Sequence, residues 1–71
     1  MSGLQHRVGQ RVRQLREKRG WSQEEFADIC GLHRTYISSV ERGERNLTLN
    51  SLHTLAKALN VKMAEILRGL D

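Results

Sequence analysis

Residues 22–41, SQEEFADICGLHRTYISSVE, decide the fold of this chain. Within them Ala27 is followed by Gly31 four positions later, by Ile37 six positions after that, and by Val40 three positions further on. A small residue such as Ala27 lets two helices approach closely, and Gly31 can adopt the positive φ of a short turn. Ile37 and Val40 lie three apart, which places both on one face of a helix. The spacing therefore predicts two short helices that cross at a steep angle through a tight turn.

The other face of the second helix is polar, because Arg34, Thr35, Ser38 and Ser39 would point outward while the apolar pair packs inward. This is the helix-turn-helix pattern, in which the second helix enters the major groove of DNA. An arginine on that face can bond O6 and N7 of guanine in a fork, and serine or threonine can reach bases or phosphates. We therefore expect a helix-turn-helix over about residues 22–42.

Capping signals mark where these helices begin. Ser22, with Glu25 three residues later, predicts a capping box, in which each side chain bonds a backbone N–H that the first turn leaves free. Trp21 directly precedes the cap, where an apolar residue can pack on the first turn as a hydrophobic staple. Cys30 is expected to be a buried small apolar residue.

Three further helices follow from the period of the apolar residues. Residues 4–18 carry a stripe at i, i+4, i+8 and i+11, and Gly20 stops that helix. A fourth helix is expected to begin near Thr48, and a fifth to span about residues 62–67, with Asn60 as its candidate cap. The apolar faces of these helices are Leu4, Val8, Val12 and Leu15; Leu52, Leu55, Ala56 and Leu59; and Met63, Ile66 and Leu67. No stretch alternates with period two, so the fold class is all-α, a compact five-helix domain spanning residues 1–71.

Composition excludes several other classes. A chain of 71 residues with 38% hydrophobic residues can form one small core. A single cysteine excludes a disulfide framework and a cysteine-based zinc site, and His6, His33 and His53 have no metal-ligand spacing. No apolar run approaches the roughly 20 residues of a membrane span, and no signal peptide is apparent, so no membrane partner and a cytoplasmic location are expected. No cofactor is expected either.

The net charge of +4 favours an anionic partner only weakly, and its distribution says more. Residues 4–19 hold six bases and one acid, residues 20–31 hold three acids and no base, and the bases Arg34, Arg42 and Arg45 follow. This pattern predicts a basic surface built from two segments; the alternative is a set of solvated helix faces.

The chain resembles the phage-repressor and Cro-like helix-turn-helix family, a five-helix DNA-binding domain common in bacterial regulators. The resemblance covers about residues 6–67 and is carried by VRQLR at 12–16, RGWSQEEFA at 19–27, IS at 37–38, VERG at 40–43, Leu52, LAKAL at 55–59 and Val61. A narrower resemblance, through RTYIS at 34–38, ERG at 41–43 and RNLTL at 45–49, is to the controller proteins of restriction–modification systems. Those are short dimers that activate and repress their own operon, but the run also occurs in other small regulators.

The resemblance implies roles for individual residues. Gln23 would contact a phosphate and support the recognition helix. Tyr36 lies among polar neighbours and is expected to pack on the sugar–phosphate backbone; the alternative is a place in the core. Glu41 would pair with an arginine of the same chain, with Arg16 as the candidate, and His33 would either cap the recognition helix or touch DNA. The expected DNA-binding set is Gln23, His33, Arg34, Thr35, Tyr36, Ser38, Ser39, Arg42, Arg45 and Asn46.

One recognition helix reads about half an operator, so a homodimer on a near-palindromic site is expected. The predicted dimer face lies on the C-terminal helices, about residues 48–68 and just beyond, and consists of Leu49, Leu52, Met63, Ile66, Leu67 and Leu70. Only four residues follow Leu67, so no small-molecule effector is expected.

The function predicted from the sequence is therefore a sequence-specific transcriptional regulator that binds double-stranded DNA. It would be autoregulatory, as a repressor or an activator, and could control a restriction–modification operon. The alternative is an antitoxin or adaptor whose main partner is another protein. An enzyme is not expected, because no paired carboxylates, phosphate-binding glycine loop or activated nucleophile is evident.

Overall fold

The computed structural model describes residues 3–70 and folds them into five helices with no strand among them. The all-α class and the five predicted helices are confirmed. The helices are α1 (Gly3–Lys18), α2 (Gln23–Cys30), α3 (Arg34–Glu41), α4 (Leu49–Leu59) and α5 (Met63–Leu67).

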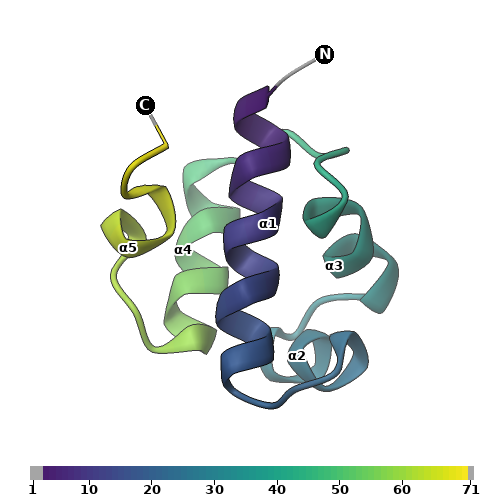
Figure 1. Cartoon of the computed structure of the whole chain (residues 1–71). Coiled ribbons are helices and arrows are strands. Elements are labelled where there is room, and N and C mark those ends of the chain that lie inside the picture. The colour runs from purple at the N-terminus through teal and green to yellow at the C-terminus, as the bar shows by residue number, and fades with distance from the viewer. Residues whose placement is uncertain (1–2, 71) are drawn as a thin grey trace.

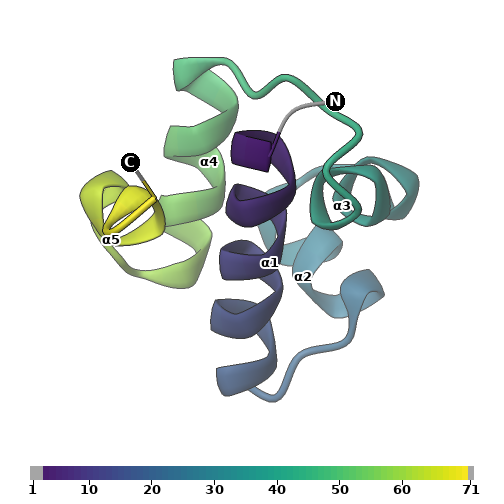
Figure 2. The same ribbon diagram turned by 45° about the horizontal axis from the view of Figure 1, so that its top comes forward.

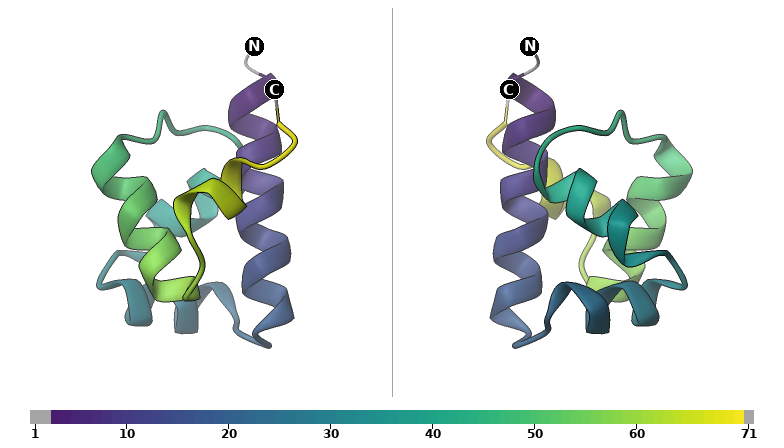
Figure 3. Two further views of the ribbon diagram at one scale, coloured as in Figure 1. Left: turned by 90° about the vertical axis from the view of Figure 1, so that its left-hand side faces the viewer. Right: turned by 90° about the vertical axis from the view of Figure 1, so that its right-hand side faces the viewer.

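Helix α1 stands at the centre of the molecule (Figure 1), with α4 and α5 on one side of it and α3 on the other. Helix α2 crosses below, next to the C-terminal end of α1, and the tilted view in Figure 2 shows α2 and α3 meeting through their short turn. In the right-hand view of Figure 3, α3 lies at the front of the molecule with nothing drawn over it. The fold thus presents one short helix on an open face.

The two helices of the predicted motif begin and end as the sequence indicates. The Ser22 hydroxyl accepts from the Glu25 amide at 3.0 Å, and the Glu25 carboxylate accepts from the Ser22 amide at 2.8 Å. Trp21 stacks against Phe26 with ring centroids 6.0 Å apart, which confirms the staple. Gly31 ends α2 with φ of 71°, a conformation that few other residues adopt.

The ends of α4 and α5 differ in part from expectation. Thr48 caps α4 as predicted, because its hydroxyl accepts from the Ser51 amide at 3.0 Å. Asn60 does not cap α5: it ends α4 in the left-handed conformation, with φ of 58°. Helix α5 instead begins after Lys62, whose side chain makes no capping bond.

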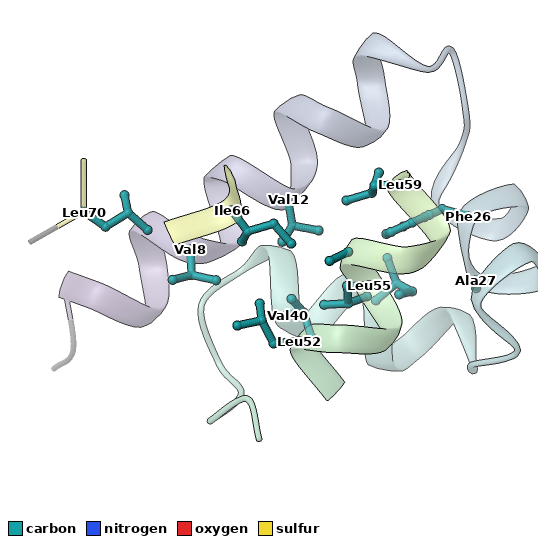
Figure 4. Packing of buried hydrophobic residues seen from close by; sticks show 12 residues of the cluster. Val8, Val12, Phe26, Ala27, Val40, Leu52, Leu55, Leu59, Ile66 and Leu70 are labelled. Atoms are coloured by element: carbon teal, nitrogen blue, oxygen red, sulfur yellow. The ribbon is translucent and has the colours of Figure 1, made fainter. Parts of the chain in front are cut away.

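The core joins all five helices (Figure 4). Val8 and Val12 of α1, Phe26 of α2, Leu55 of α4 and Ile66 of α5 all point into it. Leu4 was expected to continue the α1 stripe but is 55% exposed, because the stripe passes the edge of the core at the first turn. Within residues 3–70, the buried apolar residues are Val8, Val12, Phe26, Ala27, Ile37, Val40, Leu52, Leu55, Ala56, Leu59, Ile66 and Leu70.

Helix α1 touches the backbone of α3 at Gly9, a contact that the sequence pattern did not indicate. A Cβ at this position would lie 2.3 Å from the carbonyl oxygen of Val40 and 2.8 Å from that of Glu41. Gly43, at φ of 76°, likewise lies over the backbone of His6. Two glycines therefore set how closely the C-terminal end of α3 approaches α1.

Candidate DNA-binding surface

The open face of α3 carries the first residues of the predicted recognition helix. Arg34 and Thr35 are exposed, and Ser38 is half-buried with its hydroxyl accepting from an Nη atom of Arg42. His33 is the N-cap, with its Nδ1 accepting from the Thr35 amide at 3.2 Å and lying 2.7 Å from the Thr35 hydroxyl. His33 therefore caps the recognition helix, which is one of its two predicted roles. Because the ring is exposed, it is also accessible to DNA.

Ser39 does not point outward, and this prediction is wrong. Ser39 is only 9% exposed, and its hydroxyl donates a hydrogen bond to the carbonyl of Tyr36 at 2.8 Å. The same oxygen accepts from Nε of Arg45 at 3.1 Å. Ser39 follows Ser38 by about 100° around the helix, which turns its side chain toward the loop after α3.

The loop after α3 is held against the helix by its own predicted site residues. The Arg45 guanidinium lies over the half-buried Tyr36 ring, 5.0 Å from its centroid. Asn46 accepts a hydrogen bond from the side-chain amide of Gln5 on α1. The loop therefore places Arg45 and Asn46 beside the open face of α3.

Arg42 is paired within the chain, which lowers its availability as a free cation. Its Nη2 lies 3.1 Å from Oε1 of Glu44, and both side chains are more than half exposed. The hydrogen bond to Glu44 raises the pKa of Arg42, and the same bond lowers the pKa of Glu44. Because the pair is open to solvent, a phosphate can compete with Glu44 for this guanidinium.

A buried charge cluster lies behind the open face and joins three helices. Arg16 of α1 donates from Nε and Nη2 to the two carboxylate oxygens of Glu41, at 2.7 and 3.0 Å. Gln23, the first residue of α2, donates from Nε2 to Oε1 of Glu41 at 3.0 Å, and Arg16 also donates to the carbonyl of Trp21 at 2.7 Å. The hydrogen bond to Glu41 raises the pKa of Arg16. The predicted Arg16–Glu41 pair is confirmed, and it fixes the start of α2 against the end of α3.

Two arginines of α1, Arg7 and Arg11, bind backbone carbonyls of this chain instead of forming part of the predicted basic surface. Arg11 donates to the carbonyls of Glu65 and Arg68 at 2.7 and 2.9 Å, and Arg7 donates to the carbonyl of Gly69 at 3.2 Å. These bonds satisfy carbonyls in and after α5, on the side of α1 away from α3 (Figure 1). The predicted two-segment basic surface is therefore wrong for these residues, which face α5.

The predicted dimer face divides into exposed and buried residues. Leu49 is 76% exposed, Leu67 is 42% exposed, and Met63 is half-buried. The other three were wrongly assigned, because this chain's own core buries them: Leu52, Ile66 and Leu70. Leu4, which is not part of the predicted dimer face, is also exposed and lines a groove of about 200 Å³ together with Leu67 and residues of the loop after α3.

Other kinds of site were also considered. Within residues 3–70, no group of three His, Cys, Asp or Glu side chains is placed to hold a metal ion. Cys30 is half-buried, less than predicted, and this burial raises the pKa of its thiol to about 11. No helix in the same range is long and apolar enough to cross a membrane.

A helix-turn-helix family model matches residues 12–66, which span the C-terminal part of α1, all of α2, α3 and α4, and nearly all of α5. The chain belongs to this family of DNA-binding transcriptional regulators. The resemblance inferred from the sequence is confirmed.

Within the family, the chain is similar to restriction–modification control proteins. It is 53% identical over 60 residues to control protein C.SmaI of Serratia marcescens, covering 84% of this chain and 71% of that protein. The controller protein C.AhdI from Aeromonas hydrophila shares 44% identity at a TM-score of 0.83, covering 86% of this chain and 92% of the other. A C.Esp1396I tetramer in complex with its natural 35-base-pair operator shares 37% identity at a TM-score of 0.88, covering 99% and 92%.

Proposed function

We propose that this protein is a sequence-specific transcriptional regulator that acts as a homodimer on a near-palindromic operator and controls a restriction–modification operon, including its own gene. The observation that carries the proposal is the open face of α3, where Arg34 and Thr35 are exposed beside a loop that bears Arg45 and Asn46. The similarity to controller proteins over most of the chain supports the operon assignment. Such a regulator acts where the chromosome lies, in the bacterial cytoplasm.

The surface divides into residues that read bases and residues that hold the backbone. Arg34 stands in the first turn of α3, from which helix-turn-helix proteins reach base edges, and its guanidinium suits O6 and N7 of guanine. Thr35 and Ser38 lie on the same face. Arg42, Arg45 and Asn46 flank that face and suit phosphates, which set register and affinity rather than sequence preference.

Gln23 and Tyr36 complete the proposed surface. The Gln23 amide is held by Glu41 through one of its two N–H groups, which leaves the other for a phosphate. Arg45 covers one face of the Tyr36 ring, and Tyr36 also packs against the core, so its hydroxyl is the group that we propose contacts the sugar–phosphate backbone.

The dimer is proposed to form through Leu49, Leu67 and Met63, with Leu4 added by the structure. A single recognition helix reads about half of an operator, and half-sites lie about one helical turn apart. Exposed leucines on α1, α4 and α5 provide an apolar surface for a second copy.

The test is selection of random duplexes by the purified protein at about 150 mM salt, followed by sequencing of the retained DNA. A near-palindrome that also occurs upstream of the protein's own gene supports an autoregulatory dimer. If the folded protein enriches no motif, the proposal fails, and an antitoxin or adaptor that binds another protein becomes the better account.

Two substitutions then separate base reading from backbone contact. Arg34→Ala should weaken binding to the selected site by about 1–3 kcal/mol and leave binding to unrelated DNA nearly unchanged. Arg45→Ala should weaken both alike and make the plot of log K against log salt shallower by about 0.9. Equal losses on both DNAs for Arg34→Ala would remove Arg34 from the base-reading set.

A further inference from the structure

We infer that Ser39 is a positioning residue, which orients Arg45 toward the DNA backbone without touching DNA itself. The inference rests on the proposed function, since it assigns a role within that surface. It also replaces the direct contact that the sequence pattern suggested for Ser39, which the burial of this side chain does not allow.

The hydrogen-bond polarity of the Ser39 hydroxyl is fixed by its surroundings. A hydroxyl has one proton to donate and two lone pairs to accept with. Ser39 spends its proton on the carbonyl of Tyr36, at 2.8 Å within α3. Its oxygen is therefore left as an acceptor, and Nε of Arg45 occupies it at 3.1 Å.

Ser39 and Tyr36 together leave one edge of the Arg45 guanidinium for a ligand. The guanidinium carries five N–H donors in a rigid plane. Ser39 takes the Nε donor, and Cζ of the guanidinium lies over the Tyr36 ring, 5.0 Å from its centroid. The four donors on the two Nη atoms make no hydrogen bond within residues 3–70, and a planar pair of this kind suits two oxygens of one phosphate.

The backbone of the loop is anchored at the same residue. The Glu44 amide donates to the carbonyl of Ser39 at 2.9 Å, so Ser39 holds both the start of the loop and the arginine that follows. A flexible arginine loses conformational entropy when it binds, and fixing it beforehand reduces this loss. Ser39 therefore acts on affinity through Arg45, because its hydroxyl already donates to Tyr36 and accepts from Arg45.

The experiment is a double-mutant cycle with Ser39→Ala, Arg45→Ala and the combined variant, measured on the selected duplex across a salt series. Ser39→Ala should raise Kd by about three- to tenfold, the range of one hydrogen bond, and should make the salt slope shallower by up to about 0.9. In the Arg45→Ala background, the same change should alter Kd by less than about twofold, because neighbouring residues that act through each other are not additive.

A matched control separates positioning from folding. Thr54→Val removes a hydroxyl that donates to the carbonyl of Asn50 at 3.0 Å, a bond like that of Ser39, but on α4 and away from Arg45. It should leave the salt slope unchanged. If Ser39→Ala proves poorly folded, Arg45→Lys tests the same contact on an exposed side chain, since it keeps the charge but has no Nε donor or flat face. Kd should then rise at least threefold.

Additive losses in the cycle, an unchanged Kd for Ser39→Ala, or wild-type binding by Arg45→Lys would each overturn the positioning role while leaving the regulator intact. Failure of the wild-type protein to bind any duplex specifically is a different result, which removes the proposed function and this role together.

Discussion

Removal of Glu41 should cost more stability than any other single change to a polar residue in the described part of the chain. The Glu41 side chain is 3% exposed and the Arg16 side chain is 9% exposed, so their charges are compensated by each other rather than by water. Glu41→Ala deletes the acceptors of three hydrogen bonds, two from Arg16 and one from Gln23. Arg16 keeps its hydrogen bond to the carbonyl of Trp21 and a long ion pair with the half-exposed Glu17 carboxylate at 4.0 Å.

The expected loss is about 3–5 kcal/mol, the cost of leaving one charge of a buried pair uncompensated. A domain of this length has a total free energy of unfolding of roughly 4–11 kcal/mol, taken at 0.05–0.15 kcal/mol per residue. Glu41→Ala should therefore lower Tm by about 15 °C or more. If the free energy of unfolding of the wild-type protein is near roughly 4 kcal/mol, this loss is enough to unfold the variant. The double variant Arg16→Met with Glu41→Leu removes both charges and should recover most of the loss.

Urea unfolding followed by the single tryptophan measures all three proteins, because Trp21 adjoins the cluster. The control is Glu65→Gln, which breaks a pair with the 73%-exposed Arg68 side chain and should cost under about 1 kcal/mol. A loss below about 1 kcal/mol for Glu41→Ala would show that water reaches the pair and would refute the reasoning.

Three further predictions test the packing, the dimer face and the thiol. Gly9→Ala should destabilise the protein by about 1–3 kcal/mol in urea unfolding, because the new Cβ meets the carbonyl oxygen of Val40; a gain would show that helix propensity outweighs the clash. Leu49→Lys with Leu67→Lys should shift sedimentation equilibrium toward monomer without loss of helix, and an unchanged dimer would place the interface elsewhere. Cys30, whose pKa is raised from 9.0 to about 11, should react with iodoacetamide at pH 8 about a hundredfold more slowly than in urea; equal rates would contradict its burial. Because the folded pKa is the higher one, the stability from this group is present below pH 9 and is lost as pH rises toward 11.

The local features of the fold could be predicted from sequence because each depends on residues close together in the chain. The capping box of Ser22 and Glu25, the turn at Gly31 and the Thr48 cap all act within one helical turn. The core stripes follow the helical period in the same way. The Arg16–Glu41 pair spans 25 residues, and it could be predicted only because the family resemblance identified Glu41 as an internal partner.

The errors concern which helix faces meet, and no local pattern contains that information. Ser39 lies between outward-facing Ser38 and inward-facing Val40, so the tilt of α3 against α1 decides its environment. Leu52 and Leu67 are both apolar helix residues, but the packing of the helices leaves the first 5% exposed and the second 42% exposed. The role of Gly9 could not be predicted from the sequence, because a glycine inside a helix indicates only a lower helix propensity. Its reason becomes clear once the backbone of α3 is seen to pack against it.

The placement of the basic side chains also changes what the net charge means. The sequence has six bases between residues 4 and 19, and these seemed to favour an anionic partner. In the structure, Arg7 and Arg11 donate hydrogen bonds to backbone carbonyls in and just after α5. Arg19 donates to the carbonyl of Leu59 at 2.6 Å, and Arg16 is buried with Glu41. Arg13 also pairs with Glu17 at 3.1 Å, so five of the six are used within the domain. Salt dependence of DNA binding should consequently follow the few arginines on and after α3, and a slope much steeper than those contacts allow would mean that α1 also reaches the DNA.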